Sequence, residues 1–229
     1  SRGSVPDMPT PPPLNSAPPS TAPSRSAASR SAAPERASTV TGEDGRARCA
    51  WVGSTDDLVR YHDDEWGRPV RGDTALFERI ALEAFQSGLS WLTILRRRES
   101  FRAAFRQFEP AAVAAMTDAD VEQLLGNEAI IRNRRKIEAT IANARALVSW
   151  QDEHPNALDA LIWSFTPEPS TRTRPATLAD VPSATDSSRA LAAALRDRGF
   201  QFVGPTTMYA LMQATGVVDD HVVGCWKAD

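Results

Sequence analysis

Both cysteines of the chain lie in short motifs that also hold a histidine. The two motifs lie near the two ends of residues 46–229, the part of the chain that is rich in large apolar side chains. Cys49 and His62 have twelve residues between them, and His221 and Cys225 lie four apart. On a helix, residues four apart share one face and can hold one ion together. Two thiolates and two imidazoles make the closed tetrahedral set that zinc prefers in structural sites. Such a zinc would join the start of a domain to its end, which constrains the whole fold between them.

Spacing alone leaves other interpretations of these four residues open. The two cysteines could be separate buried thiols, or they could form a disulfide, which would leave the two histidines unexplained. A zinc held by all four side chains would have no open position for water or substrate. We therefore expect any metal here to be structural rather than catalytic.

Composition narrows the class of protein. The chain has 229 residues, a net charge of −3 and 41% hydrophobic residues. It contains no apolar run long enough to span a membrane and no secretory signal, and two cysteines do not make a disulfide framework. We expect a monomeric cytoplasmic protein.

The first 45 residues differ from the rest, because they are rich in Pro, Ser and Ala and nearly lack large apolar side chains. Such a segment cannot bury enough surface to offset its ordering entropy, so we expect a disordered tail. The leading S-R-G-S resembles a vector-derived extension, with Met8 as the natural start. A transit peptide is the alternative, but the proline density disfavours the amphipathic helix that such peptides need. One domain is expected over residues 46–229.

Apolar residues recur with helical spacing throughout this domain, and no segment alternates convincingly with period two. Asp73 is positioned to cap the helix that follows it, and Thr117 with Asp120 forms a second start signal. Residues 166–182 hold four prolines and indicate a loop. The fold class is therefore predicted to be all-α, with helices over 74–88, 91–105, 110–116, 117–125, 132–148, 156–165, 187–198 and 205–215.

A basic cluster follows a helix–turn–helix junction, L-L-G-N-E-A-I-I-R-N-R-R-K-I. Arg132, Arg134, Arg135 and Lys136 give a local charge of +4 at the start of the long helix. A charge run is usually a solvated face. In a helix-hairpin-helix, however, backbone amides and flanking basic side chains bind a DNA phosphate without reading the sequence.

An acidic residue accompanies a group of aromatic ones. Glu83 follows Leu76 and Ile80 along the edge of an apolar helix face, where a carboxylate needs a partner or a ligand. Any single aromatic residue in a helical domain is most often part of the core. The aromatic residues in the neighbouring motifs are Trp51, Tyr61, Trp66 and Trp91.

These motifs together resemble the DNA-3-methyladenine glycosylase I family over nearly all of residues 48–226. The resemblance implies a helix-hairpin-helix fold whose ends are joined by a structural zinc. Carried over position by position, its ligands are Cys49, His62, His221 and Cys225. The matching segments are R-C-A-W, Y-H-D-D-E-W-G, L-E-A-F-Q-S-G-L-S-W-L-T-I-L, I-I-R-N-R-R-K-I-E-A-T-I-A-N-A-R, W-S-F, R-D-R-G-F-Q-F-V-G-P-T-T, Y-A-L-M-Q-A-T-G and D-D-H-V-V-G-C.

The resemblance also implies a base pocket. Glu83 matches the acidic, candidate catalytic residue that hydrogen-bonds the damaged adenine, and Leu89 is a candidate wedge into the base stack. Two positions depart from the family: Leu58 replaces a pocket aromatic found in some relatives, and Ala129 replaces a hairpin glycine. The aromatics that match the base enclosure are Trp51, Tyr61 and Trp91, with Trp66 beside them, and the phosphate-facing candidates are Arg132, Arg134 and Lys136.

The chemistry of the lesion fits these residues. N3-alkylated adenine is cationic while its sugar bond is intact, so π-faces and a carboxylate attract it more than neutral adenine. Once flipped from the duplex, the base is a good leaving group that water can replace. Lys136 is followed by Glu138 and by no further acid before Asp152. We expect a monofunctional hydrolase of nucleoid DNA that leaves an abasic site, needs no nucleotide cofactor and does not bind membranes.

Two other functional classes compete with this one. A DNA-binding module that had lost catalysis would have no reason to keep both the acid and the aromatic residues. A catalytic zinc hydrolase would need an open coordination position, but four protein ligands fill all the positions of a tetrahedral zinc.

Overall fold

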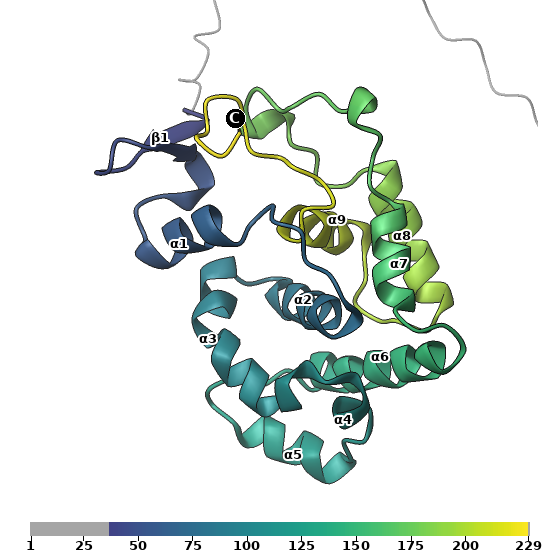
Figure 1. Ribbon diagram of the computed structural model, residues 1–229. Coiled ribbons are helices and arrows are strands. Elements are labelled where there is room, and N and C mark those ends of the chain that lie inside the picture. Colours follow the sequence, from purple (N-terminus) through teal and green to yellow (C-terminus); the bar gives the residue numbers. More distant parts are fainter. Residues whose placement is uncertain (1–36, 229) are drawn as a thin grey trace, which may run out of the picture. The chain divides into compact units, whose positions relative to one another are not determined.

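Helix α2 (Asp73–Gln86) lies in the middle of the fold (Figure 1). It buries the apolar face predicted for it. The structure is a computed structural model and describes residues 37–228. Leu76, Phe77 and Ile80 are fully buried on α2. Its partners surround it: α3 (Trp91–Ala104), α6 (Arg134–Glu153), α7 (Ala157–Ser164) and α9 (Pro205–Ala214).

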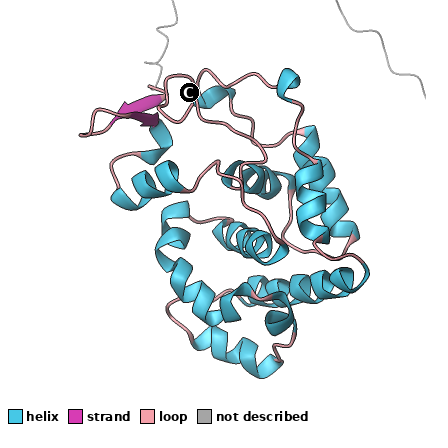
Figure 2. Ribbon diagram, viewed as in Figure 1, coloured by secondary structure: helices cyan, strands magenta, loops and turns pink. Residues whose placement is uncertain are grey.

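All eight predicted helices are confirmed (Figure 2). The helix that carries His62, α1 (Asp56–Asp64), was not predicted, because its sequence D-D-L-V-R-Y-H-D-D is mostly polar. Within the described part of the chain, no helix is both long and apolar enough to cross a membrane. The remaining elements are α4 (Pro110–Ala114), α5 (Asp118–Gly126), α8 (Asp186–Asp197), and the 3-10 turns η1 (Ala50–Val52), η2 (Arg106–Phe108), η3 (Pro169–Thr171) and η4 (Leu178–Asp180).

The all-α prediction needs one correction, a short hairpin at the start of the described residues. Strands β1 (Thr39–Thr41) and β2 (Ala47–Cys49) pair antiparallel, with Thr39 opposite Cys49. Strands of three residues are too short to show an alternating pattern. The hairpin includes residues that the sequence assigned to the tail, and the rest of that predicted tail, residues 1–36, lies outside the described residues.

The end of the chain returns to this hairpin. The backbone N–H of Trp226 donates to the carbonyl oxygen of Ala47 at 2.8 Å, so the C-terminal segment after α9 lies beside β2 (Figure 1). This contact brings the two predicted cysteine–histidine motifs to one end of the fold.

The start of α2 differs from the prediction that Asp73 caps its own helix. Gly72 is the capping residue, with φ 85°. The Asp73 carboxylate instead accepts from the backbone N–H of Asp159 at 2.9 Å, and the Asp159 carboxylate accepts from the N–H of Gly72 at 2.7 Å. Each aspartate therefore caps the other's helix, α7 or α2, a pairing that spacing along the sequence does not reveal.

The chain reverses after α3 through a left-handed turn. Arg106, Gln107 and Phe108 have φ of 55°, 58° and 53°. This conformation costs an L-residue about 1–2 kcal/mol. Phe108 is fully buried and stacks on Phe105 with ring centroids 5.5 Å apart, so core packing offsets the strain.

Candidate functional site

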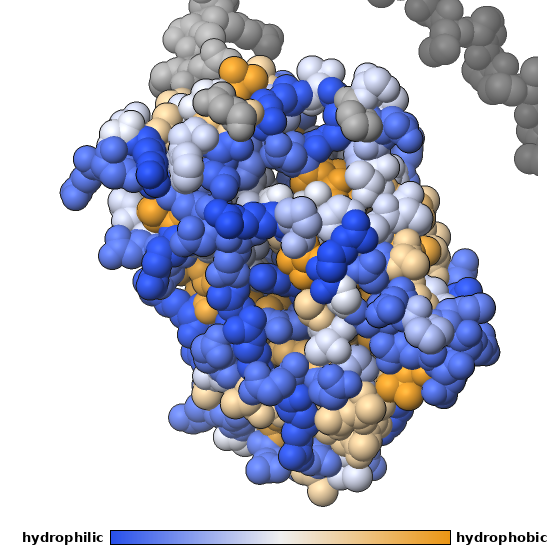
Figure 3. Space-filling model, viewed as in Figure 1, coloured by the Kyte–Doolittle hydropathy of each residue, from blue (hydrophilic) through white to orange (hydrophobic). Residues whose placement is uncertain are grey.

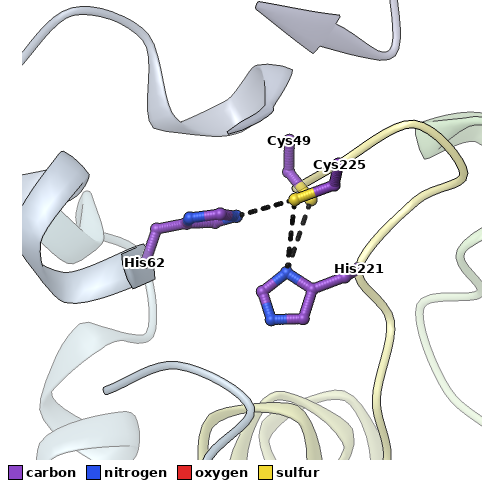
Figure 4. Close-up of side chains that lie close together, drawn as sticks. All are labelled: Cys49, His62, His221 and Cys225. Carbon is purple, nitrogen blue, oxygen red and sulfur yellow. Dashed lines mark hydrogen bonds between the residues drawn. The ribbon is translucent and has the colours of Figure 1, made fainter. Parts of the chain in front are cut away.

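The four predicted metal ligands converge in the structure (Figure 4). Their ligand atoms lie within 4.8 Å of one another, and all four side chains are buried. Cys49 ends β2 and His62 lies on α1, while His221 and Cys225 lie in the segment after α9. Residues 221–225 form a loop and not a helix, and the loop turns at Gly224, where φ is 84°.

The spacing of the atoms fits a tetrahedral ion. Cys225 Sγ lies 3.4 Å from His62 Nε2 and 3.7 Å from His221 Nδ1, and Cys49 Sγ lies 3.8 Å from His221 Nδ1. A tetrahedral zinc with bonds of about 2.0–2.3 Å separates its ligand atoms by about 3.3–3.8 Å. Both cysteines are free thiols, which excludes the disulfide alternative. The donor set and its geometry therefore fit a zinc-type ion.

Burial controls the protonation of these groups. It lowers the pKa of His221 to about 4, so the imidazole is neutral and has a lone pair available to a metal. It raises the pKa of the Cys49 thiol to about 12. Binding of a cation would therefore displace a thiol proton.

A carboxylate orients one ligand. Asp63 Oδ1 lies 2.8 Å from His62 Nδ1, which leaves Nε2 directed at Cys225. Arg48 binds the same carboxylate through Nε and Nη2, and Trp226 Nε1 donates to it at 3.2 Å. Although burial raises the pKa of Asp63, these hydrogen bonds lower it to about 2, so it is ionised. Metal-binding histidines commonly donate their second N–H to such a carboxylate.

A cavity of about 630 Å³ lies beside the cysteine–histidine cluster. The structure brings the four predicted aromatic residues and Glu83 together in its wall, and Leu58 lines it as well. Trp51 lies edge-on to Trp66 with ring centroids 5.1 Å apart, and Tyr61 lies 5.2 Å from Trp91. The indole N–H of Trp91 is buried and has no acceptor among residues 37–228. We call these four aromatic residues and Glu83 the aromatic box.

Glu83 is a buried acid without a partner. It is 5% exposed, and within the described part of the chain its carboxyl makes no hydrogen bond or ion pair. Burial raises its pKa to about 8, while the charge of Arg79 opposes that rise. An unpaired buried carboxyl in a cavity is costly unless a ligand compensates it, and such a group is typical of a binding site.

Two of the three predicted phosphate-facing residues lie on the surface. Arg132 and Arg134 are exposed, and they pair with Glu128 at 3.6 Å and Glu122 at 2.6 Å. Ala129 is not among the described residues with positive φ, and its N–H donates to Asn127 Oδ1 at 3.0 Å. The loss of a glycine at this position therefore introduces no backbone strain.

The prediction for Lys136 is wrong. Its side chain is buried, with 8% exposure, and Nζ donates to the carbonyl oxygens of Phe85 at 3.0 Å and Ser87 at 2.7 Å. These carbonyls lie at the C-terminal end of α2, where a cation is favourable. Lys136 thus fastens the loop after α2 to the start of α6 and does not face solvent.

That loop carries Leu89, which is 39% exposed and does not line the cavity. Gln86 Nε2 donates to the Leu89 carbonyl at 2.8 Å and fixes the turn. Exposed apolar side chains are few, and the face drawn in Figure 3 is mostly hydrophilic. An exposed leucine beside a cavity-lining residue is compatible with the predicted wedge.

Several cavity residues were missed from the sequence. Gln86, Gln213 and Asp220 line the cavity. Asp220 accepts from Tyr209 Oη at 2.5 Å and from Gln213 Nε2 at 2.9 Å, and it pairs with Arg172. For Asp220, the sequence offered one indication of this position, because it is adjacent to His221 and the segment that leads to the metal cluster passes the cavity.

Comparisons with known proteins find one family and several similar solved structures. The family described as methyladenine glycosylase matches residues 51–228. DNA-3-methyladenine glycosylase 1 of Escherichia coli (strain K12) is 48% identical over 178 residues, 78% of this chain and 95% of that protein. A crystal structure of 3-methyladenine DNA glycosylase I (TAG) is similar at TM-score 0.74 and 46% identity, covering 78% of this chain and 98% of its own. A structure of 3-methyladenine DNA glycosylase I from Staphylococcus aureus, described as the structural basis of 3-methyladenine recognition, has TM-score 0.74 and 31% identity, covering 80% and 96%.

Proposed function

The chain belongs to the methyladenine glycosylase family, and we propose from this premise that it is a DNA repair enzyme that excises 3-methyladenine from alkylated double-stranded DNA. The observation that carries the proposal is the partnerless, buried Glu83 within the aromatic box. Glu83 would act on the base, and Trp51, Tyr61, Trp66 and Trp91 would enclose it.

The aromatic box selects its substrate by charge. N3-methylated adenine carries a positive charge while it is bonded to the sugar, whereas normal adenine is neutral. Indole faces attract the cation, which also favours the ionised form of Glu83 once it is bound, and the low polarity of a buried site strengthens that attraction. Neutral adenine gains less, so it returns to the duplex.

Access to the aromatic box requires base flipping, which costs roughly a few kcal/mol and least for damaged bases. Leu89, exposed on the loop after α2, would fill the space that the flipped base leaves. The loop over residues 127–133 joins α5 to α6 in the manner of a helix-hairpin-helix. Its amides would bind a phosphate, with Arg132 and Arg134 supplying the flanking charge.

We further propose hydrolysis without strand cleavage. The alkylated base is a good leaving group, so water can replace it as the sugar develops positive charge. A strand-cleaving enzyme would need an amine nucleophile, but no lysine of residues 37–228 lines the cavity, and Lys136 Nζ is bound to two carbonyls. The product would be an abasic site in an unbroken strand.

The cysteine–histidine cluster would hold a structural zinc. Cys49, His62, His221 and Cys225 fit four-coordinate zinc in donor type, spacing and burial. Bound zinc would supply a cross-link between the hairpin, α1 and the C-terminal loop. One chain provides both this cluster and the aromatic box, so we propose a monomer acting on nucleoid DNA.

The test uses the purified, zinc-loaded protein and methylated duplex DNA. Released bases are identified by chromatography, and a gel reports strand breaks. Free 3-methyladenine with unbroken strands supports the proposal. Binding of the DNA without release, from a folded sample, would instead support a DNA-binding module.

A further inference from the structure

Arg79 lies on α2 one turn before Glu83 and has an unused hydrogen-bond donor. Its side chain is 12% exposed, and Nη2 donates to Glu65 Oε2 at 3.2 Å. Nη1 is buried and has no acceptor within residues 37–228. A buried guanidinium N–H without an acceptor is costly, so a compensating group is expected nearby.

Glu65 cannot neutralise Arg79 fully, because it is shared. Arg98 on α3 binds the same carboxylate through two hydrogen bonds, of 2.5 Å to Oε2 and 2.8 Å to Oε1. Two guanidinium groups therefore share one carboxylate, which leaves an excess charge of +1 in a partly buried group. Such a charge is stabilised by one further anion nearby.

Glu83 is the anion that fits. It lies four residues after Arg79, so both side chains lie on the same face of α2. The charge of Arg79 lowers the pKa of Glu83 against the larger effect of burial. Arg79 does not line the cavity, whereas Glu83 does. A flipped base would therefore meet the carboxylate with the guanidinium behind it.

The other charged groups around Glu83 are already paired. Glu78 on α2 pairs with Arg102 of α3 at 2.8 Å. Across the cavity, Asp220 pairs with Arg172 at 2.6 Å. From α1, Tyr61 adds a neutral phenol, since burial raises its pKa well above the ordinary value. Of these groups, only Arg79 has a buried side-chain donor that lacks an acceptor within residues 37–228.

We propose that Arg79 is a positioning residue for excision, whose charge favours the ionised form of Glu83 at the cavity wall that meets the cationic base. The proposal rests on the glycosylase function proposed above. Glu65 and Arg98 set the strength of this effect, because they take up part of the Arg79 charge.

The experiment compares wild type with Arg79→Met and Arg79→Lys. Single-turnover excision of 3-methyladenine is measured from about pH 5.5 to 9.5, with enzyme-free loss subtracted. Arg79→Met should move the acidic limb of the pH–rate profile upward by about one unit, which lowers the rate near neutral pH about tenfold. Arg79→Lys keeps the positive charge, so its acidic limb should lie close to that of the wild type. The control Arg102→Met removes a neighbouring guanidinium, which binds Glu78 and Glu99, and should leave the limb in place.

Glu65→Gln gives a second test with the opposite sign. Without its shared carboxylate, the charge of Arg79 acts more strongly on Glu83, and the limb should move to lower pH. General damage to the fold does not produce that direction, so this variant remains informative if Arg79→Met fails to fold.

Superposable pH profiles for wild type, Arg79→Met and Glu65→Gln would overturn the role of Arg79. If Arg79→Met does not fold, a Glu65→Gln profile whose acidic limb has not moved would also overturn the role of Arg79. If wild type releases no 3-methyladenine in the same assay, the proposed function itself fails, which distinguishes the two outcomes.

Discussion

The indole of Trp66 lies edge-on to the imidazole of His221, with ring centroids 4.7 Å apart and planes at 88°. Trp66 also stacks on His62, and Trp51 meets His62 edge-on at 5.5 Å. Two walls of the aromatic box therefore rest directly on two rings of the metal cluster. The cluster and the box form one packed unit, so loss of a metal ligand should also shift the indoles of the aromatic box.

The first prediction concerns the metal. Cys225→Ser should lower the metal content and the melting temperature together, because a lost ligand costs at least about 3 kcal/mol, or about 6–12 °C. Excision should fall as well, since Trp51 and Trp66 lose the rings against which they pack. The matched control is Val223→Ser, an exposed position in the same loop. Full metal content with unchanged melting in Cys225→Ser would contradict a structural metal.

The second prediction concerns the carboxylate that orients His62. Asp63→Asn should weaken zinc affinity about 10- to 100-fold, because an amide holds the Nδ1 proton of His62 less strongly. Competition with a chromogenic chelator measures this change. Asp64→Asn, at the exposed neighbouring position, should retain wild-type affinity. Equal affinities for the two variants would show that Asp63 does not support the site.

The third prediction follows from the pKa of Glu83, about 8 in the folded protein against an ordinary 4.5. Between these values the unfolded chain has lost a proton that the folded protein retains, so this group lowers the free energy of unfolding as pH rises. Glu83→Gln does not ionise in either state. Its stability relative to wild type should therefore increase from about pH 4.5 to 8 by on the order of a few kcal/mol. Urea unfolding at both ends of the window measures it; a pH-independent difference would refute the shifted pKa.

The fourth prediction separates Lys136 from the exposed basic residues. Lys136→Met should reduce the free energy of unfolding by about 2–4 kcal/mol, because two buried carbonyls lose a charged donor. Its DNA affinity should keep the wild-type salt dependence. Arg134→Ala should instead make the plot of log DNA-binding constant against log salt concentration less steep by about one. The free energy of unfolding should change little. A reduced slope in folded Lys136→Met would restore the phosphate role for that residue.

The sequence was sufficient for features that repeat or that depend on residue type. Helical spacing located α2 to α9, since each buries an apolar face such as Leu76, Phe77 and Ile80. The chemistry of two thiols and two imidazoles selected the cluster that the structure brings together. Both signals are local or compositional, so they do not require knowledge of the fold.

The errors arise where backbone groups from distant segments are the partners. Lys136 was predicted to face phosphate because its sequence neighbours are basic, but it binds the carbonyls of Phe85 and Ser87. Asp73 was predicted to cap its own helix, but its acceptor oxygen meets the N–H of Asp159. His221 and Cys225 come together through a turn at Gly224, which their spacing along the sequence does not reveal. Such partners are set by tertiary packing, which spacing along the chain does not encode.

The most direct test compares wild type and Glu83→Gln for single-turnover excision of 3-methyladenine from methylated duplex DNA at neutral pH. Glu99→Gln, exposed on α3, is the matched control. Loss of a buried charged contact with the cationic base should slow excision about ten- to hundredfold in Glu83→Gln and leave the control unchanged. Equal rates for all three proteins would contradict the assignment of Glu83 and its aromatic box as the excision site.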